Sequence, residues 1–171
     1  MKTFVLAVAI VGLAAFPGIS NAQRNLGNLG GNPDNPNSTA NPFGAGNPFN
    51  PNSVNNPFGM YGNPFSPNSA TNPNATHPPM LFDQQGNYRG NLTTNPYDPN
   101  SISNPYGRYG DLYSPDSINN PFGAGNPYAP NSPTNLYGEG WKIIGAKLNV
   151  NHEPDSLKIR RATVDRRRSL G

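Results

Sequence analysis

Apolar residues gather in three short stretches of the chain, at 4–16, 80–82 and within 140–150, and polar segments rich in Asn, Pro and Gly separate them. The second stretch and Asn87–Arg89 flank a polar, Gly-terminated loop, a pattern typical of a β-hairpin. Two strands alone are marginal in water. We therefore expect the flanking segments and the strand-like third stretch, through Trp141, Ile143 and Ile144, to pack on this hairpin.

The polar segments carry an internal repeat built on the tripeptide Pro-(Asn/Asp)-Ser. Its serines are spaced by 15, 16, 32, 16 and 15 residues, at Ser38, Ser53, Ser69, Ser101, Ser117 and Ser132. The spacing of 32 is two periods of 16, so the hairpin segment replaces one unit in the middle of the chain.

One unit, "SPDSINNPFG" at 114–123, predicts a short helix followed by a turn. Ser114 is a suitable N-cap and Pro115 suits the first helical position. Pro121 ends the helix after a single turn of 3₁₀ type. The Asn-Pro-aromatic-Gly sequence that follows is typical of a tight turn, which projects one aromatic ring.

Two interpretations of these units are open: a low-complexity linker with transient turns, or a fold in which the rings pack between neighbouring repeats. In the second, the structural residues of the repeat are Ser101, Ile102, Tyr106, Ser117, Ile118, Phe122 and Trp141. The expected fold is then a turn-rich repeat architecture, with one-turn 3₁₀ helices and Asn-Pro-aromatic-Gly turns around a small central β-hairpin, a signal helix at the N-terminus and flexible ends.

Composition limits what the fold can bury. Leu, Ile, Val and Phe supply 23 of the 149 residues from 23 to 171, and the chain has no cysteine, so aromatic residues and side-chain hydrogen bonds must hold any folded state. We expect a flexible segment at 23–50, degenerate repeats at 51–79, an ordered core at 80–150 and a basic tail at 151–171.

The first 22 residues have the layout of a secretory signal peptide. Lys2 precedes the apolar run 4–16, and the small-x-small sequence Ser20-Asn21-Ala22 predicts cleavage before Gln23. The run is shorter than the roughly 20 residues that span a bilayer. We expect an exported protein, periplasmic or extracellular, with no membrane span after the signal is removed.

The repeats resemble those of a family of short exported bacterial proteins of unknown function. The resemblance covers about 80–141 and rests on tandem S-P-x-S-I-x-N-P-Y-G units, here "SPDSINNPFG", after a D-x-x-G-x-Y-x-G-x-L segment, here "DQQGNYRGNL". It implies export and a repeat fold, and it carries no catalytic residues. The basic tail is a departure from that family.

Residues with the chemistry of an active site are scarce. His77 and His152 have no Ser or Asp partner at motif spacing, and no phosphate-loop or metalloprotease motif is present. The carboxylates are too scattered for a calcium site. We expect no enzyme activity and no cofactor. Asn-Pro-Phe occurs five times, but Asn-Pro-Tyr replaces it elsewhere, which favours a structural role over a peptide ligand.

Charge is uneven along the chain. Residues 142–171 hold eight basic and three acidic residues, whereas 23–141 hold three basic and six acidic residues. The tail, through Arg160, Arg161, Arg166, Arg167 and Arg168, could contact an anionic polymer or be a solvated end. Nucleic acid is not expected, because no aromatic residue is interleaved with these arginines.

Two functions follow from the sequence: a non-enzymatic structural or interaction protein of the cell envelope or exterior, or a module that binds carbohydrate or anionic polymer through exposed tyrosines and the basic tail. The partner would be an envelope polymer or another envelope protein.

Overall fold

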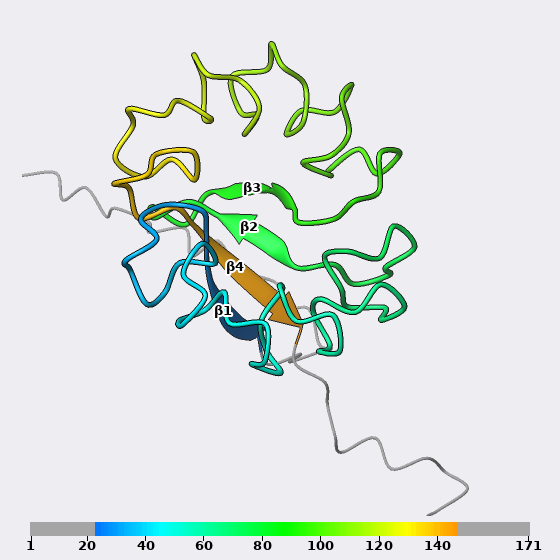
Figure 1. Cartoon of the computed structure of the whole chain (residues 1–171). Coiled ribbons are helices and arrows are strands. Elements are labelled where there is room, and N and C mark those ends of the chain that lie inside the picture. Colours follow the sequence, from blue (N-terminus) through cyan, green and yellow to red (C-terminus); the bar gives the residue numbers. More distant parts are fainter. Residues whose placement is uncertain (1–22, 147–171) are drawn as a thin grey trace, which may run out of the picture.

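The computed structural model describes residues 23–146, which form one antiparallel sheet surrounded by turns (Figure 1). The strands are β1 (Gln23–Leu29), β2 (Met80–Phe82), β3 (Tyr88–Asn91) and β4 (Trp141–Ala146), in the spatial order β1-β4-β2-β3. The predicted signal helix at 1–22 and the basic tail at 151–171 lie outside the described residues.

The predicted hairpin is present. β2 and β3 pair antiparallel, with Phe82 opposite Tyr88, and the N–H of Gly86 donates to the carbonyl of Asp83 in the loop between them. The third apolar stretch forms β4, which pairs with β2 in the middle of the sheet rather than closing one side of it. The hairpin therefore occupies one edge of a four-stranded sheet.

The other edge is β1, which lies in the segment that we expected to be flexible. β1 pairs antiparallel with β4 and buries Leu26. The first repeat follows β1 directly, and the core extends well upstream of 80–150, since it includes Val54, Tyr61 and Ala70. Strand β1 has little apolar character of its own and is fixed by pairing with a strand far along the chain.

The repeats are ladders of turns, and the predicted 3₁₀ helices are wrong for the described chain. In the second repeat the N–H of Asn50 donates to Asn47 O, that of Ser53 to Asn50 O, and that of Asn56 to Ser53 O, at 3.0–3.2 Å. A 3₁₀ helix needs such a bond at each residue, whereas here it recurs at every third. Proline usually follows the first residue of a triplet and holds that residue out of the helical region.

Side chains reinforce the same three-residue period. Where a triplet begins with Asn, Ser or Asp, the side-chain oxygen of that residue accepts a hydrogen bond from the backbone N–H two residues later. Asn47 accepts in this way from Phe49, and Asn50 from Asn52. These are Asx and Ser/Thr turns, which replace water with a local side-chain partner. One repeat is therefore four consecutive triplets followed by a segment of three or four residues, such as NPF-NPN-SVN-NPF-GMYG at 47–62.

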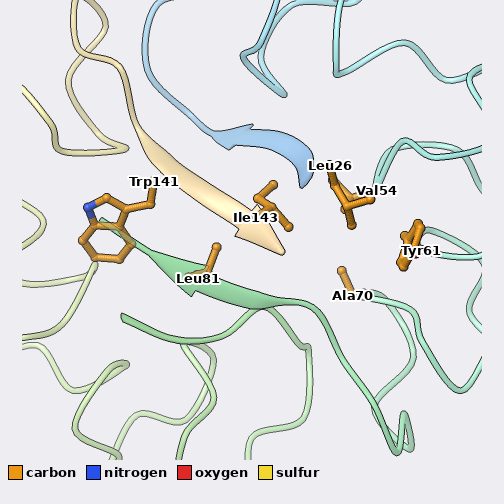
Figure 2. Close-up of a cluster of buried hydrophobic side chains, with 7 residues drawn as sticks. All are labelled: Leu26, Val54, Tyr61, Ala70, Leu81, Trp141 and Ile143. Carbon is orange, nitrogen blue, oxygen red and sulfur yellow. The ribbon is translucent and has the colours of Figure 1, made fainter. Parts of the chain in front are cut away.

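The apolar core is small and extends from the central strands of the sheet to the repeats of the first half (Figure 2). Leu81 and Ile143 contribute from the central strands, and the other members are Leu26, Val54, Tyr61, Ala70 and Trp141. Repeat serines fill the remaining interior: the six Pro-(Asn/Asp)-Ser serines are 0–2% exposed. The interior thus combines a few apolar side chains with a row of satisfied hydroxyls, and no buried side-chain atom of the described residues lacks a hydrogen-bond partner.

The described chain is an internal duplication, with β1, three repeats and β2 followed by β3, three repeats and β4. Residues 63 apart make the same contacts: Asn28 bridges Ser38 as Asn91 bridges Ser101. Gly27 and Gly90 have φ angles of 105° and 99°, and each faces the carbonyl of the equivalent Asn37 or Asn100. The first strand of each half pairs with the last strand of the other half, so the sheet has a pseudo-twofold axis between β2 and β4.

The duplication explains the spacing of 32 between Ser69 and Ser101. The interval contains the end of the first copy, the loop Asp83–Asn87 and the start of the second copy. The hairpin is the junction between the two halves, and no repeat has been replaced.

Candidate interaction surface

Aromatic rings form the most prominent surface feature of the described chain. Ten rings are 88–94% exposed, and they are Phe43, Phe49, Phe58, Phe65, Tyr97, Tyr106, Tyr113, Phe122, Tyr128 and Tyr137. Each is the third residue of a triplet that begins with Asn or Asp. Our expectation that these rings pack between repeats is therefore wrong.

The local backbone explains why the rings point outward. The N–H of Tyr106 donates to Oδ1 of Asn104 at 2.9 Å, and the N–H of Gly107 donates to the Asn104 carbonyl at 3.1 Å. Pro105 fixes φ between them. These bonds turn the first residue of the triplet inward and leave the third on the outside of the corner. The N–H of Phe122 donates to Oδ1 of Asn120 in the same way.

The side chains that hold each repeat together are a serine and the asparagine three residues after it. The serine hydroxyl of four repeats donates to the carbonyl eight residues earlier, as Ser101 does to Thr93 at 3.0 Å. The asparagine donates through Nδ2 to the carbonyl six residues earlier in all six repeats, from Asn41, Asn56, Asn72, Asn104, Asn120 and Asn135. These asparagines were not among the predicted structural residues, although the three-residue spacing of Asn, Ser and Asp is a signal for them.

The predicted structural residues divide into two groups. Ser101, Ser117 and Trp141 are buried, and Ile102 and Ile118 are partly buried against the core. Tyr106 and Phe122 are 93% and 94% exposed and contribute to the surface instead. The two groups occupy different triplets of each repeat. The buried serine and the inward-facing aliphatic residue, such as Ser101 and Ile102, are in the third triplet, whereas the exposed ring, such as Tyr106, is the last residue of the fourth.

The two halves display different rings. The first half carries Phe43, Phe49, Phe58 and Phe65, and the second half carries Phe122 and five tyrosines. In the last repeat Tyr128 and Tyr137 line a shallow groove of about 370 Å³, together with Pro127, Thr134, Asn135 and Leu136. The surface of the second half is therefore aromatic and rich in hydroxyl groups.

An ion-pair cluster ties the hairpin to the fifth repeat. Arg89 of β3 contacts Asp83 and Asp116 at 3.0 Å each, and Arg108 contacts Asp116 at 2.6 Å. The Arg89 guanidinium also lies 5.9 Å from the centre of the Trp141 ring. Burial alone would raise the pKa of Asp83, but hydrogen bonds from Asn87 and Arg89 outweigh it, so the pKa lies below its usual value. The cluster is internally neutralised and fixes the loop between the two copies to the second copy.

A group of three packed rings from the hairpin and the fourth repeat is distinct from the displayed rings. Tyr88 packs edge-on between Phe82 and Tyr109, with ring centres 5.7 and 5.4 Å apart, and its hydroxyl donates to Oδ1 of Asn91 at 2.6 Å. Burial, followed by the nearby Tyr109 and Asp98, raises the pKa of Tyr88 to about 12. This phenol is neutral at physiological pH.

Few side chains of the described residues are arranged as a catalytic or metal-binding site would require. Nδ1 of His77 lies 2.9 Å from Oγ1 of Thr76 on an exposed surface. No group of three or more His, Asp or Glu side chains within 23–146 could hold a metal ion. His152 and the five arginines of the tail fall outside that range. None of the described residues forms a helix that could cross a membrane.

Comparison with known proteins gives no relative. No protein-family model matches the chain, no curated protein matches it, and no solved structure matches it.

Proposed function

We propose that the protein is exported and acts as a non-enzymatic interaction protein of the cell envelope or exterior, which contacts its partner through the displayed rings. One observation carries the proposal: ten rings are held in solvent on hydrogen-bonded corners. Folding gains nothing from rings that stay in water, whereas each displayed ring can bury apolar surface against a partner.

The export part of the proposal is supported by the signal-like layout of the first 22 residues and by the resemblance of the repeats to those of exported bacterial proteins. The non-enzymatic part is supported by the scarcity of nucleophile, base and metal-ligand clusters in the sequence. Direct evidence for location is a cell-fractionation measurement, in which the mature protein is expected to begin at Gln23.

The alternative function, binding of carbohydrate or anionic polymer, is favoured by one observation. Five of the displayed rings are tyrosines, which combine an apolar face with a hydroxyl group. The basic tail would serve an anionic polymer, whereas the tyrosines alone would serve a neutral one.

The test compares retention in the envelope fraction for three forms of the full chain. In the first, six displayed rings are replaced by alanine: Phe43, Phe58, Tyr97, Tyr106, Tyr113 and Tyr128. In the second, the matched control, the exposed aliphatic residue Leu112, which does not line the groove between Tyr128 and Tyr137, is replaced by alanine. The third is the wild type.

The ring variant is expected to fold, to reach the same compartment and to lose retention, and the leucine variant is expected to behave as the wild type. Retention of the ring variant at the wild-type level would overturn the proposed contact surface. Recovery of wild-type protein only from the cytoplasm would overturn export.

A further inference from the structure

We propose that the tyrosine face of the second half binds a neutral polysaccharide chain. The tyrosine face is defined as the five exposed side chains Tyr97, Tyr106, Tyr113, Tyr128 and Tyr137. This inference rests on the proposed function in one respect: it assumes that displayed rings make the contact, and it then names the partner.

The internal duplication supplies a comparison within one molecule. The triplet positions of the five tyrosines are occupied in the first half by Asp34, Phe43, Phe49, Phe65 and Asn74. The two copies share their turn ladders, and Phe43 and Tyr106 are both 93% exposed. Because the backbone and the exposure are the same, folding does not require a hydroxyl at these positions. The displayed phenol groups are therefore a property of the second half alone.

The hydroxyls of this face are free to meet a ligand. Inside the fold, the hydroxyl of Tyr61 donates to the carbonyl of Ala146, and that of Tyr88 donates to Asn91. The five tyrosines of the face make no such bond to any described residue; only their backbone N–H groups are bonded, for example that of Tyr128 to Asn126. Each presents a ring face together with an unpaired donor and acceptor.

This combination fits a sugar. A pyranose ring offers C–H groups on its faces and hydroxyls around its rim, so a tyrosine can cover the first and hydrogen-bond the second. Phenylalanine offers only the first contact. The change from Phe to Tyr between the two copies therefore marks the second half as the side suited to a polar, hydroxyl-rich ligand.

The net charge of the residues that carry the tyrosine face favours a neutral polysaccharide over an acidic one. Residues 92–140, which carry the face, contain four acidic side chains, Asp98, Asp111, Asp116 and Glu139, and one basic side chain, Arg108. Arg108 is already paired with Asp116. A surface of net negative charge repels an acidic polymer.

The spacing of the rings favours a polymer over a folded protein. No pair of displayed rings within 23–146 is stacked, and the only aromatic pairs there are the interior ones of Tyr88. Tight protein interfaces centre on a packed, desolvated cluster. Single rings that recur with the repeat suit a ligand that also repeats, because weak contacts along one chain add through effective concentration. The groove between Tyr128 and Tyr137 is a shallow site of that kind.

The test measures retention of the full-length protein on insoluble neutral polysaccharides, with cellulose, chitin and cross-linked dextran as probes and alginate beads as the anionic comparison. Wild-type protein is expected to bind at least one neutral probe equally at about 0.1 M and about 1 M salt, where the Debye length falls from about 10 to about 3 Å. Retention on alginate alone, or loss of binding at high salt, would overturn the inference.

Two matched variants isolate the hydroxyls. Replacing all five tyrosines of the face by phenylalanine keeps every ring and is expected to weaken binding at least about tenfold, since each lost hydrogen bond is worth about 1 kcal/mol. The control, Phe43→Tyr with Phe49→Tyr and Phe65→Tyr, adds hydroxyls to the first half. It is expected to leave retention intact.

Equal binding by the five-phenylalanine variant would overturn the role of the hydroxyls. The outcomes also separate this inference from the proposed function. If envelope retention depends on the rings but the protein binds no neutral polysaccharide, the proposed function is supported and the proposed ligand is rejected. If envelope retention ignores the rings, the proposed function itself fails.

Discussion

Leu81 of β2 faces Ile143 of β4 across the central strand pair, and both side chains are fully buried. This contact lies on the pseudo-twofold axis, where the two copies of the duplicated unit meet (Figure 2). The larger part of the apolar core is assembled around it.

Leu81→Ala is expected to destabilise the protein by about 2–5 kcal/mol, because it removes a fully buried side chain and leaves a cavity between the copies. Urea denaturation followed by tryptophan fluorescence measures the change. The control is Leu112→Ala, at an exposed corner, which is expected to stay within about 0.5 kcal/mol of wild type. Equal effects of the two changes would contradict the assigned core.

Asn104→Asp is expected to destabilise the fold, whereas Asn95→Asp is expected to be tolerated. Oδ1 of Asn104 accepts a hydrogen bond from the Tyr106 N–H, and its Nδ2 donates one to the Asp98 carbonyl. A carboxylate at this position keeps the bond from Tyr106. It loses the bond to Asp98 and places a negatively charged oxygen next to the Asp98 carbonyl oxygen. Asn95 only accepts through its side chain, from Tyr97, as Asp98 does naturally from Asn100. We expect a loss of about 1–3 kcal/mol for Asn104→Asp.

Thermal unfolding of the two single variants at neutral pH checks this difference. A similar Tm for both would show that the Nδ2 bond contributes nothing to the repeat.

Removing displayed rings is expected to leave stability unchanged. Tyr106→Ala and Phe122→Ala alter side chains that are more than nine-tenths exposed, so each is expected to change the free energy of unfolding by less than about 0.5 kcal/mol. The matched interior change is Tyr109→Ala, which removes a buried ring packed against Tyr88 and is expected to cost about 3–5 kcal/mol. Large losses at Tyr106 or Phe122 would mean that the rings pack after all.

Gly90→Ala is expected to be much more damaging than Gly86→Ala, although both glycines have positive φ. A Cβ on Gly90 would lie 2.8 Å from the Asn100 carbonyl oxygen and 2.9 Å from Tyr109, whereas a Cβ on Gly86 meets nothing within 4 Å. Gly86→Ala therefore costs only the backbone strain of about 1–2 kcal/mol. Comparing chemical denaturation midpoints separates strain from steric overlap, and identical midpoints would contradict the close approach of β3 to the fourth repeat.

Alkaline pH is expected to destabilise the fold through Tyr88. Its pKa is about 12 in the folded protein and about 10 in an unfolded chain, so the neutral phenol is favoured by folding. The stabilisation is complete below pH 10 and is lost as the pH rises from 10 to 12. Tyr88→Phe is expected to flatten the stability profile over that range while lowering stability at pH 8 by about 1 kcal/mol, from loss of the bond to Asn91. A variant profile parallel to wild type would contradict this assignment.

The sequence identified the elements whose signals are local. The hairpin follows from two short apolar runs around Asp83–Gly86, and its turn needs no distant residue. β1 was not identified, since Leu26 stands among Asn and Gly residues and its strand is set by pairing with β4, more than 100 residues later. Non-local pairing of this kind leaves little trace in a single-sequence pattern.

The rings were assigned to the interior because large apolar residues are usually buried. That rule considers residue type alone, whereas here the triplet that carries a ring decides its orientation. Tyr106 ends an Asn-Pro triplet and is exposed, and Tyr109, three residues later, ends a triplet that begins with Gly107 and is buried. Ser101 and Ser117 were correctly identified as structural residues of the repeat, but the pattern did not indicate what their hydroxyls bind. Ser101, for example, donates to the Thr93 carbonyl eight residues earlier.

Each of the ten triplets that carry a displayed ring separates two tasks. Its first residue makes the bonds that shape the chain, and its third residue, as at Tyr106 or Phe122, faces solvent with nothing in the fold depending on it. The third residue of these ten triplets can therefore be substituted while the backbone is conserved. The exposed phenylalanines of one copy and the exposed tyrosines of the other are two sets of surface residues on the same backbone. A third set could be engineered at these positions without a new fold.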